Sequence, residues 1–420
     1  MKNNFLKLYW VVFVVLMAAP ALLLVERRAD NLCFYTLLLL GLVMGAFRLR
    51  PSGFTFSRLL KEYWPLHLAM AGMLLAIFIN QLVLQDFVIR TYDYPSRLAF
   101  FVVLVWVALL LPYRLMRYLQ WAYVVGAFLA AAKMYVGTKD GILRMFPDFI
   151  PLIPFSQMAQ LLGFFSILSI GYDERKTLSG KLSTGLKLLV GIFGIYGAYL
   201  SQTRGAWIAI PAFLIIVILI LGRRVAKAKL LAWFAVAVIL LGVLFGSTNL
   251  VQQRVVEAKQ NLTQYQNSKN LDTSVGVRLQ LWNAALRLYS EHPLVGVGRN
   301  GYDAAMSDLE HRKIVTATAQ SQPHSHNEVL YNMATLGSFG LLGILCLYLV
   351  PGFYFWRDAR STDREIRTTA GMGLLLCSGF LIFGLTDVMF VWGTSANFYS
   401  ILAAILFAFI IKRKAALSSN

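Results

Sequence analysis

The chain has 420 residues, of which 58% are hydrophobic and only 14% are charged, whereas ordinary soluble domains carry about 25% charged residues. This composition excludes a soluble core as the main architecture, because so many apolar side chains need lipid as their solvent. The formal net charge of +19 does not indicate nucleic-acid binding, since the basic residues form short clusters between apolar runs rather than one patch. The three cysteines fall inside apolar runs, so no disulfide framework is expected.

Apolar runs long enough to cross a bilayer recur along the chain and predict an all-α integral membrane protein with about twelve transmembrane helices. The predicted spans cover residues 8–25, 32–47, 65–84, 98–113, 118–138, 149–172, 182–201, 205–222, 230–246, 328–356, 368–390 and 394–411. The first run follows a basic start, as a cleaved signal peptide would. Because that run reaches the length of a full span, we expect an uncleaved helix instead.

Basic residues mark one side of the predicted topology. They lie in alternate connections and at the C-terminus, namely Arg48, Arg50, Arg58, Lys61, Arg114, Arg117, Arg175, Lys176, Lys181, Arg223, Arg224, Lys227, Lys229, Arg357, Arg360, Arg364, Arg367, Lys412, Arg413 and Lys414. By the positive-inside rule these loops and both termini are cytoplasmic. Residues 247–325 then form one large periplasmic loop, which separates a first membrane region (1–246, spans one to nine) from a second one (326–420, spans ten to twelve).

Part of the large loop is predicted to be helical. Residues 277–289 have apolar side chains around most of a helix circumference, which indicates a helix packed against the membrane surface or other helices. Pro293 and the glycines that follow it end this helix. The segment from Gly296 to Gly301 matches the G-x-G-x-x-G dinucleotide pattern, yet it follows a helix rather than a strand. We interpret it as a glycine-rich turn that returns the loop to the membrane.

Two arginines are expected at the outer membrane surface. Residues 201–204 form a very short hairpin between two apolar helices, so Arg204 lies at the outer interface. It is either an interfacial anchor or a fixed cation that grips phosphate through two parallel hydrogen bonds. Arg278 follows Gly276 at the start of the helical stretch in the loop. It is either a solvated charge or, because its neighbours are apolar, a cation held where it meets lipid phosphates.

His326 stands where the large loop re-enters the membrane. A neutral imidazole beside arginines would serve as a general base, whereas the alternative is a histidine that caps the next helix. His324 and His326 have a spacing that suits zinc ligands on a strand, but no cysteine or third histidine follows at metal-site spacing, so we expect no metal site. Asp387, near the outer end of a predicted span, is expected to pair with an arginine or a backbone amide, or to act in catalysis.

Three motifs resemble one known family. His326-Asn327, nine further residues (328–336) and the segment Gly337-Ser338-Phe339-Gly340 resemble the signature of the O-antigen ligase and polymerase superfamily. That signature is His, then Asn, Ser or Gln, nine residues of any kind, Gly, two of any kind, and Gly, Thr or Tyr. The hairpin at 202–205, and the string at 276–278 with Trp282 and Ala285, look like its other two landmarks. Length, span count and loop position also agree, although the first six spans carry no matching motif.

The resemblance implies an O-antigen ligase, a glycosyltransferase that moves a polysaccharide from an undecaprenyl diphosphate carrier to lipid A-core at the periplasmic face of the bacterial inner membrane. By motif match, Arg204 and Arg278 would hold the diphosphate and stabilise its charge as it leaves. His326 would position or deprotonate the acceptor hydroxyl, and the flanking His324 and Asn327 would contribute to substrate binding. Direct attack would invert the transferred sugar, and no nucleotide sugar or ATP would be required.

Neither a metal ion nor another cofactor is predicted. Many glycosyltransferases hold a divalent ion with an acidic pair, but the outer loops contain no Asp-x-Asp or Glu-x-Asp, and Asp272, Asp303 and Asp308 are scattered. The nearest alternative is an O-antigen polymerase or a protein oligosaccharyltransferase of the same superfamily, which would differ in its acceptor. A transporter of lipid-linked sugars is a more distant alternative, since the polar groups crowd the outer face rather than the membrane centre.

Overall fold

The computed structural model describes residues 2–51, 53–138, 149–174, 176–222, 229, 232, 235, 249–267 and 269–418. Within this part of the chain all regular structure is helical, and nine helical segments are long and apolar enough to cross a membrane. These are α2 (Ala29–Ala46), α4 (Trp64–Leu84), the run from α7 through η2 to α8 (Tyr113–Gly137), α9 with η3 (Leu152–Tyr172), α10 (Leu178–Leu200), α11 (Arg204–Leu221), α17 (Glu328–Asp358), α18 (Arg364–Gly384) and α19 (Gly393–Ser418). The protein is therefore an all-α, multi-pass membrane protein, as predicted.

Two predicted spans differ from this set, while α1 (Lys2–Leu22) contributes a shorter apolar run, Leu8–Leu22. The span expected over 98–113 is divided into α5 (Asp93–Ala99) and α6 (Phe101–Ala108). The helix is interrupted because Phe100 has a ψ of 1°, well outside helical values. The span expected over 230–246 lies, apart from single positions, outside the described residues.

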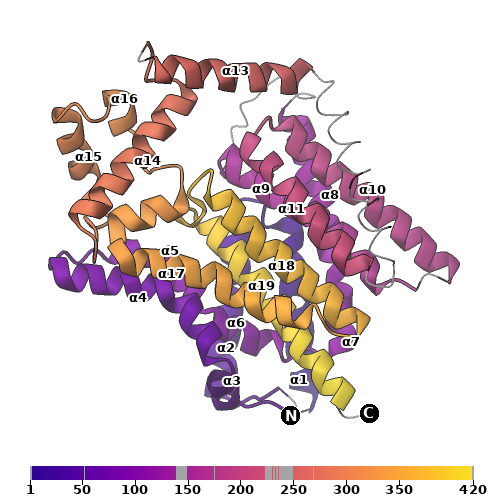
Figure 1. Ribbon diagram of the computed structural model, residues 1–420. Coiled ribbons are helices and arrows are strands. Elements are labelled where there is room, and N and C mark those ends of the chain that lie inside the picture. Colours follow the sequence, from indigo (N-terminus) through magenta and orange to yellow (C-terminus); the bar gives the residue numbers. More distant parts are fainter. Residues whose placement is uncertain are drawn as a thin grey trace.

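The long helices form a bundle with both chain ends at one end of it (Figure 1). The segment between α11 and α17 contributes helices at the opposite end, namely α13 (Asn249–Gln266), α14 (Ser274–Glu291), α15 (Tyr302–His311) and α16 (Ala317–Gln320). The helix predicted over 277–289 is thus confirmed as part of α14. We call the bundle end formed by residues 201–204, 323–327 and 385–392 the loop-side rim.

Charged side chains pair at the other end, which we call the basic rim. Its ion pairs join Arg117 to Glu365, Arg413 to Asp363 and Glu365, and Lys414 to Asp358. Lys187 lies deeper and is fully buried, in contact with Asp173 and with Gln120 Oε1 at 2.7 Å. Burying an ammonium group is tolerated only where a carboxylate and hydrogen bonds replace its water. This network joins α8, α9, α10 and α18.

The longest helix, α17, is broken at Gly337, whose φ and ψ are 61° and −148°. This conformation is essentially restricted to glycine. The break releases the carbonyls of Ala334 and Thr335, which instead accept the N–H groups of Val297 (3.0 Å) and Gly298 (2.8 Å). Backbone groups freed within a membrane protein need such replacement partners. The segment around Gly296 to Gly301 is therefore a glycine-rich turn against α17, as predicted.

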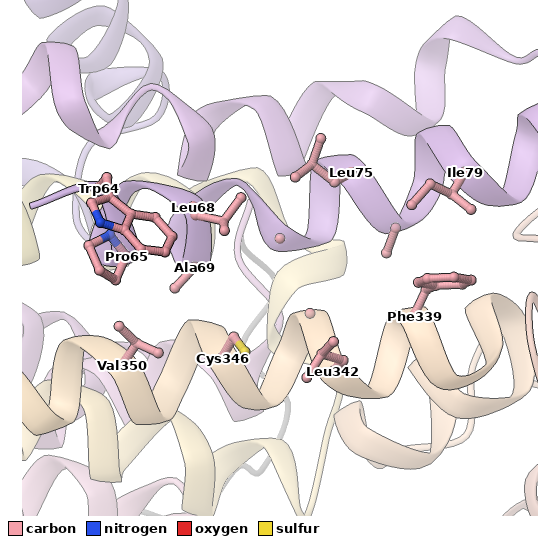
Figure 2. A pocket seen from close by; sticks show the side chains of 13 residues that line it. Trp64, Pro65, Leu68, Ala69, Leu75, Ile79, Phe339, Leu342, Cys346 and Val350 are labelled. Carbon is pink, nitrogen blue, oxygen red and sulfur yellow. The ribbon is translucent and has the colours of Figure 1, made fainter. Parts of the chain in front are cut away.

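Helices α4 and α17 approach closely where glycines face each other. A Cβ atom on Gly72 would lie 3.3 Å from the Gly343 Cα atom, and one on Gly343 would lie 3.1 Å from the Gly72 oxygen. Small residues allow this approach, as is common between membrane helices. Beside the contact runs an apolar groove of about 390 Å³, lined from Trp64 at one end to Ile79 and Phe339 at the other (Figure 2).

Candidate active site

The segment that leads into α17 holds both histidines of the signature. The Asn327 side chain caps α17, since its Oδ1 accepts the N–H groups of Val329 and Leu330, both at 3.1 Å. Its amide donates to the Leu385 carbonyl at 3.4 Å. The helix cap is therefore Asn327 and not His326, and such a cap contributes about 1 kcal/mol. This arrangement leaves the imidazole of His326 available for another role.

His326 has a φ of 49°, in the left-handed region that non-glycine residues seldom adopt. Its N–H donates to Nδ1 of His324 at 3.3 Å, and the two rings meet edge to face with centroids 4.7 Å apart. Strained backbone of this kind costs of order 1–3 kcal/mol and clusters at functional sites. Burial lowers the pKa of His324 to about 4, although the nearby Asp387 carboxylate opposes that shift, so the His324 ring is neutral at pH 7.

The His326 ring contacts a buried carboxylate. Its Nδ1 lies 3.3 Å from Asp387 Oδ1, and the side-chain exposures are 24% for His326 and 6% for Asp387. Oδ1 also accepts the N–H of Val388 at 2.9 Å. Asp387 thus has a backbone amide partner, as expected, and a histidine partner in addition. A carboxylate beside Nδ1 orients an imidazole and favours the tautomer in which Nε2 accepts a proton.

The turn that contains Asp387 follows α18 rather than lying within a span. Helix α18 ends at Gly384, and the N–H groups of Thr386 and Asp387 both turn back to the Phe383 carbonyl, at 2.9 and 3.0 Å. The span predicted over 368–390 was therefore too long at this end. Because the chain has left the helix, the Asp387 carboxylate lies at the loop-side rim and not inside the bundle.

The predicted Arg204 begins α11 beside the same turn. A Cβ atom on the next residue, Gly205, would lie only 2.4 Å from Thr386 Oγ1, so the Gly205 backbone packs directly against the Thr386 side chain. The hairpin before Arg204 is held from the other side, since Thr203 Oγ1 lies 2.7 Å from both Ser156 and Ser201 hydroxyls. Arg204 is half-buried. The hairpin and the His326 segment therefore adjoin consecutive residues of one turn.

The predicted Arg278 lies in the first turns of α14 and is also half-buried. Its neighbour Val277 shares a buried apolar cluster with Val388, the residue after Asp387. The start of α14 is further held by Gln280, whose side chain bonds the Leu271 carbonyl at 2.9 Å and the Thr316 N–H at 2.8 Å. The segments of Arg204 and His326 thus adjoin the turn formed by residues 386–388, and the Arg278 segment shares one buried apolar cluster with that turn.

One cation that motif reasoning passed over also belongs to this region. The Arg299 guanidinium lies over the Tyr331 ring at 4.3 Å and donates from Nη2 to Asn332 Oδ1 at 2.6 Å. Its Nη1 is buried without a hydrogen-bond partner among the described residues. The sequence pattern places Arg299 only within the glycine-rich turn. The signal that could have identified it is its place beside glycines that hold the turn against α17.

A buried carboxylate joins the start of α17 to the turn after α18. Glu328 is 1% exposed, and its Oε2 accepts the N–H groups of Met389 and Phe390, the latter at 3.0 Å. Its Oε1 accepts the Asn332 amide at 3.1 Å, and Asn332 is the partner of Arg299. The start of α17, the turn after α18 and the glycine-rich turn are therefore one connected network, with His326 at its partly exposed edge.

The fold and this site define a class: a multi-pass helical membrane protein with an imidazole, a carboxylate and basic residues gathered at one end of its bundle. Residues 189–345, which contain Arg204, Arg278 and His326, match the family model described as O-antigen ligase. An O-antigen ligase of Escherichia coli (strain K12) is 25% identical over 256 residues, 60% of this chain and 57% of that protein.

A further relative covers more of the chain. A protein of Haemophilus influenzae, described as uncharacterized, is 24% identical over 335 residues, which are 79% of this chain and 82% of that protein. The family model and the ligase of Escherichia coli both support the O-antigen ligase superfamily for this chain. The members of this superfamily are glycosyltransferase-like enzymes. Asp387 lies outside the segment that the family model matches, and the structure links it to the signature histidine.

Proposed function

We propose that this protein is an O-antigen ligase, which transfers a polysaccharide from undecaprenyl diphosphate to lipid A-core at the periplasmic face of the inner membrane. The match of residues 189–345 to the O-antigen ligase family model and the 25% identity to a ligase support this activity. The observation that carries the proposal is that the Arg204 and His326 segments adjoin the turn 386–388, with which the Arg278 segment shares one buried apolar cluster. In this topology both chain termini are cytoplasmic and the loop-side rim is periplasmic.

In the proposed reaction the acceptor hydroxyl oxygen attacks the anomeric carbon of the donor sugar. The bond from that carbon to the diphosphate breaks, and the diphosphate leaves with the electron pair. His326 Nε2 orients the hydroxyl or accepts its proton, because Nδ1 is directed to Asp387. Arg204 and Arg278 bind the diphosphate and stabilise its growing charge. Attack opposite the leaving group inverts the anomeric centre, and no metal ion is needed.

The remaining predicted residues have supporting roles in this proposal. Asn327 positions His326 by capping α17, and His324 supports it through the bond from the His326 N–H. His324, whose ring meets that of His326, and Asn327 would also contribute to substrate binding. The acceptor distinguishes the ligase from its nearest alternatives, since a polymerase would use a second lipid-linked glycan and an oligosaccharyltransferase a protein.

The test is a transfer assay with purified chain, lipid-linked polysaccharide and lipid A-core. His326→Ala is expected to abolish transfer, and Arg204→Lys and Arg278→Lys to weaken donor use, since lysine lacks the paired donors of a guanidinium. His292→Ala, an exposed histidine of the loop, is the matched control. Transfer by His326→Ala near the original rate would refute the assignment of His326. A lipid-flipping assay is run in parallel. If His326→Ala loses lipid flipping but not transfer, the protein would be a transporter.

The same assay tests the acceptor and the metal prediction. Lipid A-core is expected to accept polymer where a lipid-linked glycan and a peptide do not. Transfer is expected to persist in EDTA, and strong inhibition by EDTA would contradict a metal-independent reaction.

A further inference from the structure

Three potential metal ligands meet at the loop-side rim. One ligand atom each of His324, His326 and Asp387 lies within 4.8 Å of the other two. Sequence spacing argued against a metal site because no third histidine or cysteine follows the His-Ser-His string. The structure supplies the third ligand from the turn after α18, sixty-one positions further along the chain. Two imidazoles and a carboxylate are a ligand set that zinc-class cations favour.

One of the distances suits a cation held between two of these groups. His326 Nδ1 and Asp387 Oδ1 are 3.3 Å apart, which is close to the separation of two ligand atoms that each lie about 2.0–2.1 Å from a tetrahedral zinc ion. Oδ1 can keep its bond from Val388 while it binds a cation, because a carboxylate oxygen has two lone pairs. The ligand atom of His324 lies within 4.8 Å of both. His324 must release the weak 3.3 Å bond from the His326 N–H to bind through Nδ1.

The surroundings indicate an open, reversible site rather than a structural one. His324 and Asp387 are buried, at 6% and 5% exposure, whereas the His326 side chain is 24% exposed. Three protein ligands with an open fourth position are typical of zinc sites that exchange ligands, and structural zinc sites usually have four protein ligands. Only one of the three ligands is an anion, so a bound dication is not fully neutralised. We therefore expect an ion that enters from the exposed side and can be removed by a chelator.

We propose that His324, His326 and Asp387 form a zinc-class cation site. A cation in this site binds the His326 ring together with its two neighbours, His324 and Asp387, and so blocks the loop-side rim. A cation bound to Nδ1 of His326 leaves the ring proton on Nε2, so Nε2 can no longer accept a proton from a hydroxyl, and the cation replaces the direct contact between Nδ1 and Asp387. Occupancy is therefore inhibitory. The binding itself is independent of the proposed transferase activity, whereas the inhibition depends on it. A reaction that needs no metal and is stopped by one is consistent with both proposals.

Direct binding is measured on the purified full-length chain, with Co²⁺ as a spectroscopic probe and Zn²⁺ in competition with a coloured chelator. We expect one Co²⁺ per chain, with the visible bands of a four-coordinate ion, displaced by Zn²⁺. His324→Ala and Asp387→Asn are each expected to weaken Zn²⁺ binding by at least about tenfold. The double variant His292→Ala/His311→Ala, which removes two exposed histidines, is expected to bind as the original chain does.

Thermal unfolding of each variant verifies that it is folded, and His324→Gln replaces His324→Ala if the latter is not. Equal Zn²⁺ affinity in the original chain and in both ligand variants would overturn the proposal, as would loss of binding in the His292/His311 control. In the transfer assay, Zn²⁺ is expected to inhibit the original chain and EDTA to restore it; transfer unaffected by saturating Zn²⁺ would refute the inhibitory role. Binding by a chain that lacks transferase activity would leave this site standing and refute only the proposed function.

Discussion

His326 combines a left-handed backbone with a buried carboxylate at Nδ1, so its ring orientation is set from two directions. Asp387→Asn is expected to preserve the fold, because the amide oxygen can still accept the Val388 N–H. It removes the charge that stabilises the correct tautomer, so the transfer rate should fall by at least about tenfold, and comparable carboxylate-to-amide changes cost up to about 10⁴-fold. The fall should appear in kcat with little change in the donor KM. Asp303→Asn, at an exposed position, is the control, and an unchanged kcat for Asp387→Asn would remove Asp387 from the mechanism.

Arg299 supports the same region through stacking and a hydrogen bond rather than through an exposed ion pair. Arg299→Ala leaves the buried Asn332 oxygen without its donor, and we expect a loss of about 1–3 kcal/mol in unfolding free energy. Arg299→Lys keeps the charge but loses the planar contact with Tyr331, so it should restore only part of that stability. The exposed Arg312, which pairs with Asp308 and Glu291, is the comparison, and Arg312→Ala should lower the unfolding free energy much less than Arg299→Ala does. Equal losses for Arg299→Ala and Arg312→Ala, measured by denaturation in detergent, would contradict this view.

At the level of elements, the break in α17 explains why the first glycine of the signature, Gly337, must be glycine. In Gly337→Ala the new Cβ atom would lie only 2.4 Å from the Leu294 backbone. The residue would also keep a backbone conformation that L residues avoid. We expect a loss of at least about 1–3 kcal/mol in unfolding free energy, with lower transferase activity because the glycine-rich turn is displaced from α17. The melting temperature of the purified chain checks the first expectation. Gly45→Ala, where a Cβ atom meets nothing within 4 Å, is the matched control, and it should be neutral or nearly so.

The same elements show what could and could not be predicted from sequence. Hydrophobic runs located α2, α4 and α17 to within a few residues, because lipid requires continuous apolar helices. The division at Phe100 was missed, since residues 98–113 read as one apolar run. Motif spacing singled out His326, but its pairing with Asp387 depends on how α17 packs beside α18, and spacing along the chain carries no such information. The cap at Asn327 follows the local preference for Asn at helix N-termini. The structural roles of Glu328 and Arg299 depend on tertiary contacts and could not be predicted from the sequence.

On the scale of the whole molecule, the clusters of basic residues lie at one end of the bundle, the basic rim. This distribution predicts that the basic rim faces the cytoplasm. In a chain without its native cysteines, Thr362→Cys at the basic rim and Thr318→Cys in α16 are both exposed positions. An impermeant thiol reagent applied to cells with a permeable outer membrane is expected to label Thr318→Cys. Thr362→Cys should react only after the inner membrane is opened. The reverse pattern would invert the proposed topology and move the site to the cytoplasm.

The Glu328 carboxylate gives the molecule a further property. Because it binds the backbone of Met389 and Phe390 from within α17, the parts of the rim are already fastened together before any substrate arrives. The two lipid-linked substrates of the proposed reaction would therefore bind to a preformed site, without a closing motion of the protein. We expect the turnover rate to depend on how often both substrates meet at the site by lateral diffusion in the bilayer. Membrane fluidity and substrate abundance would then affect this rate more strongly than motion of the protein.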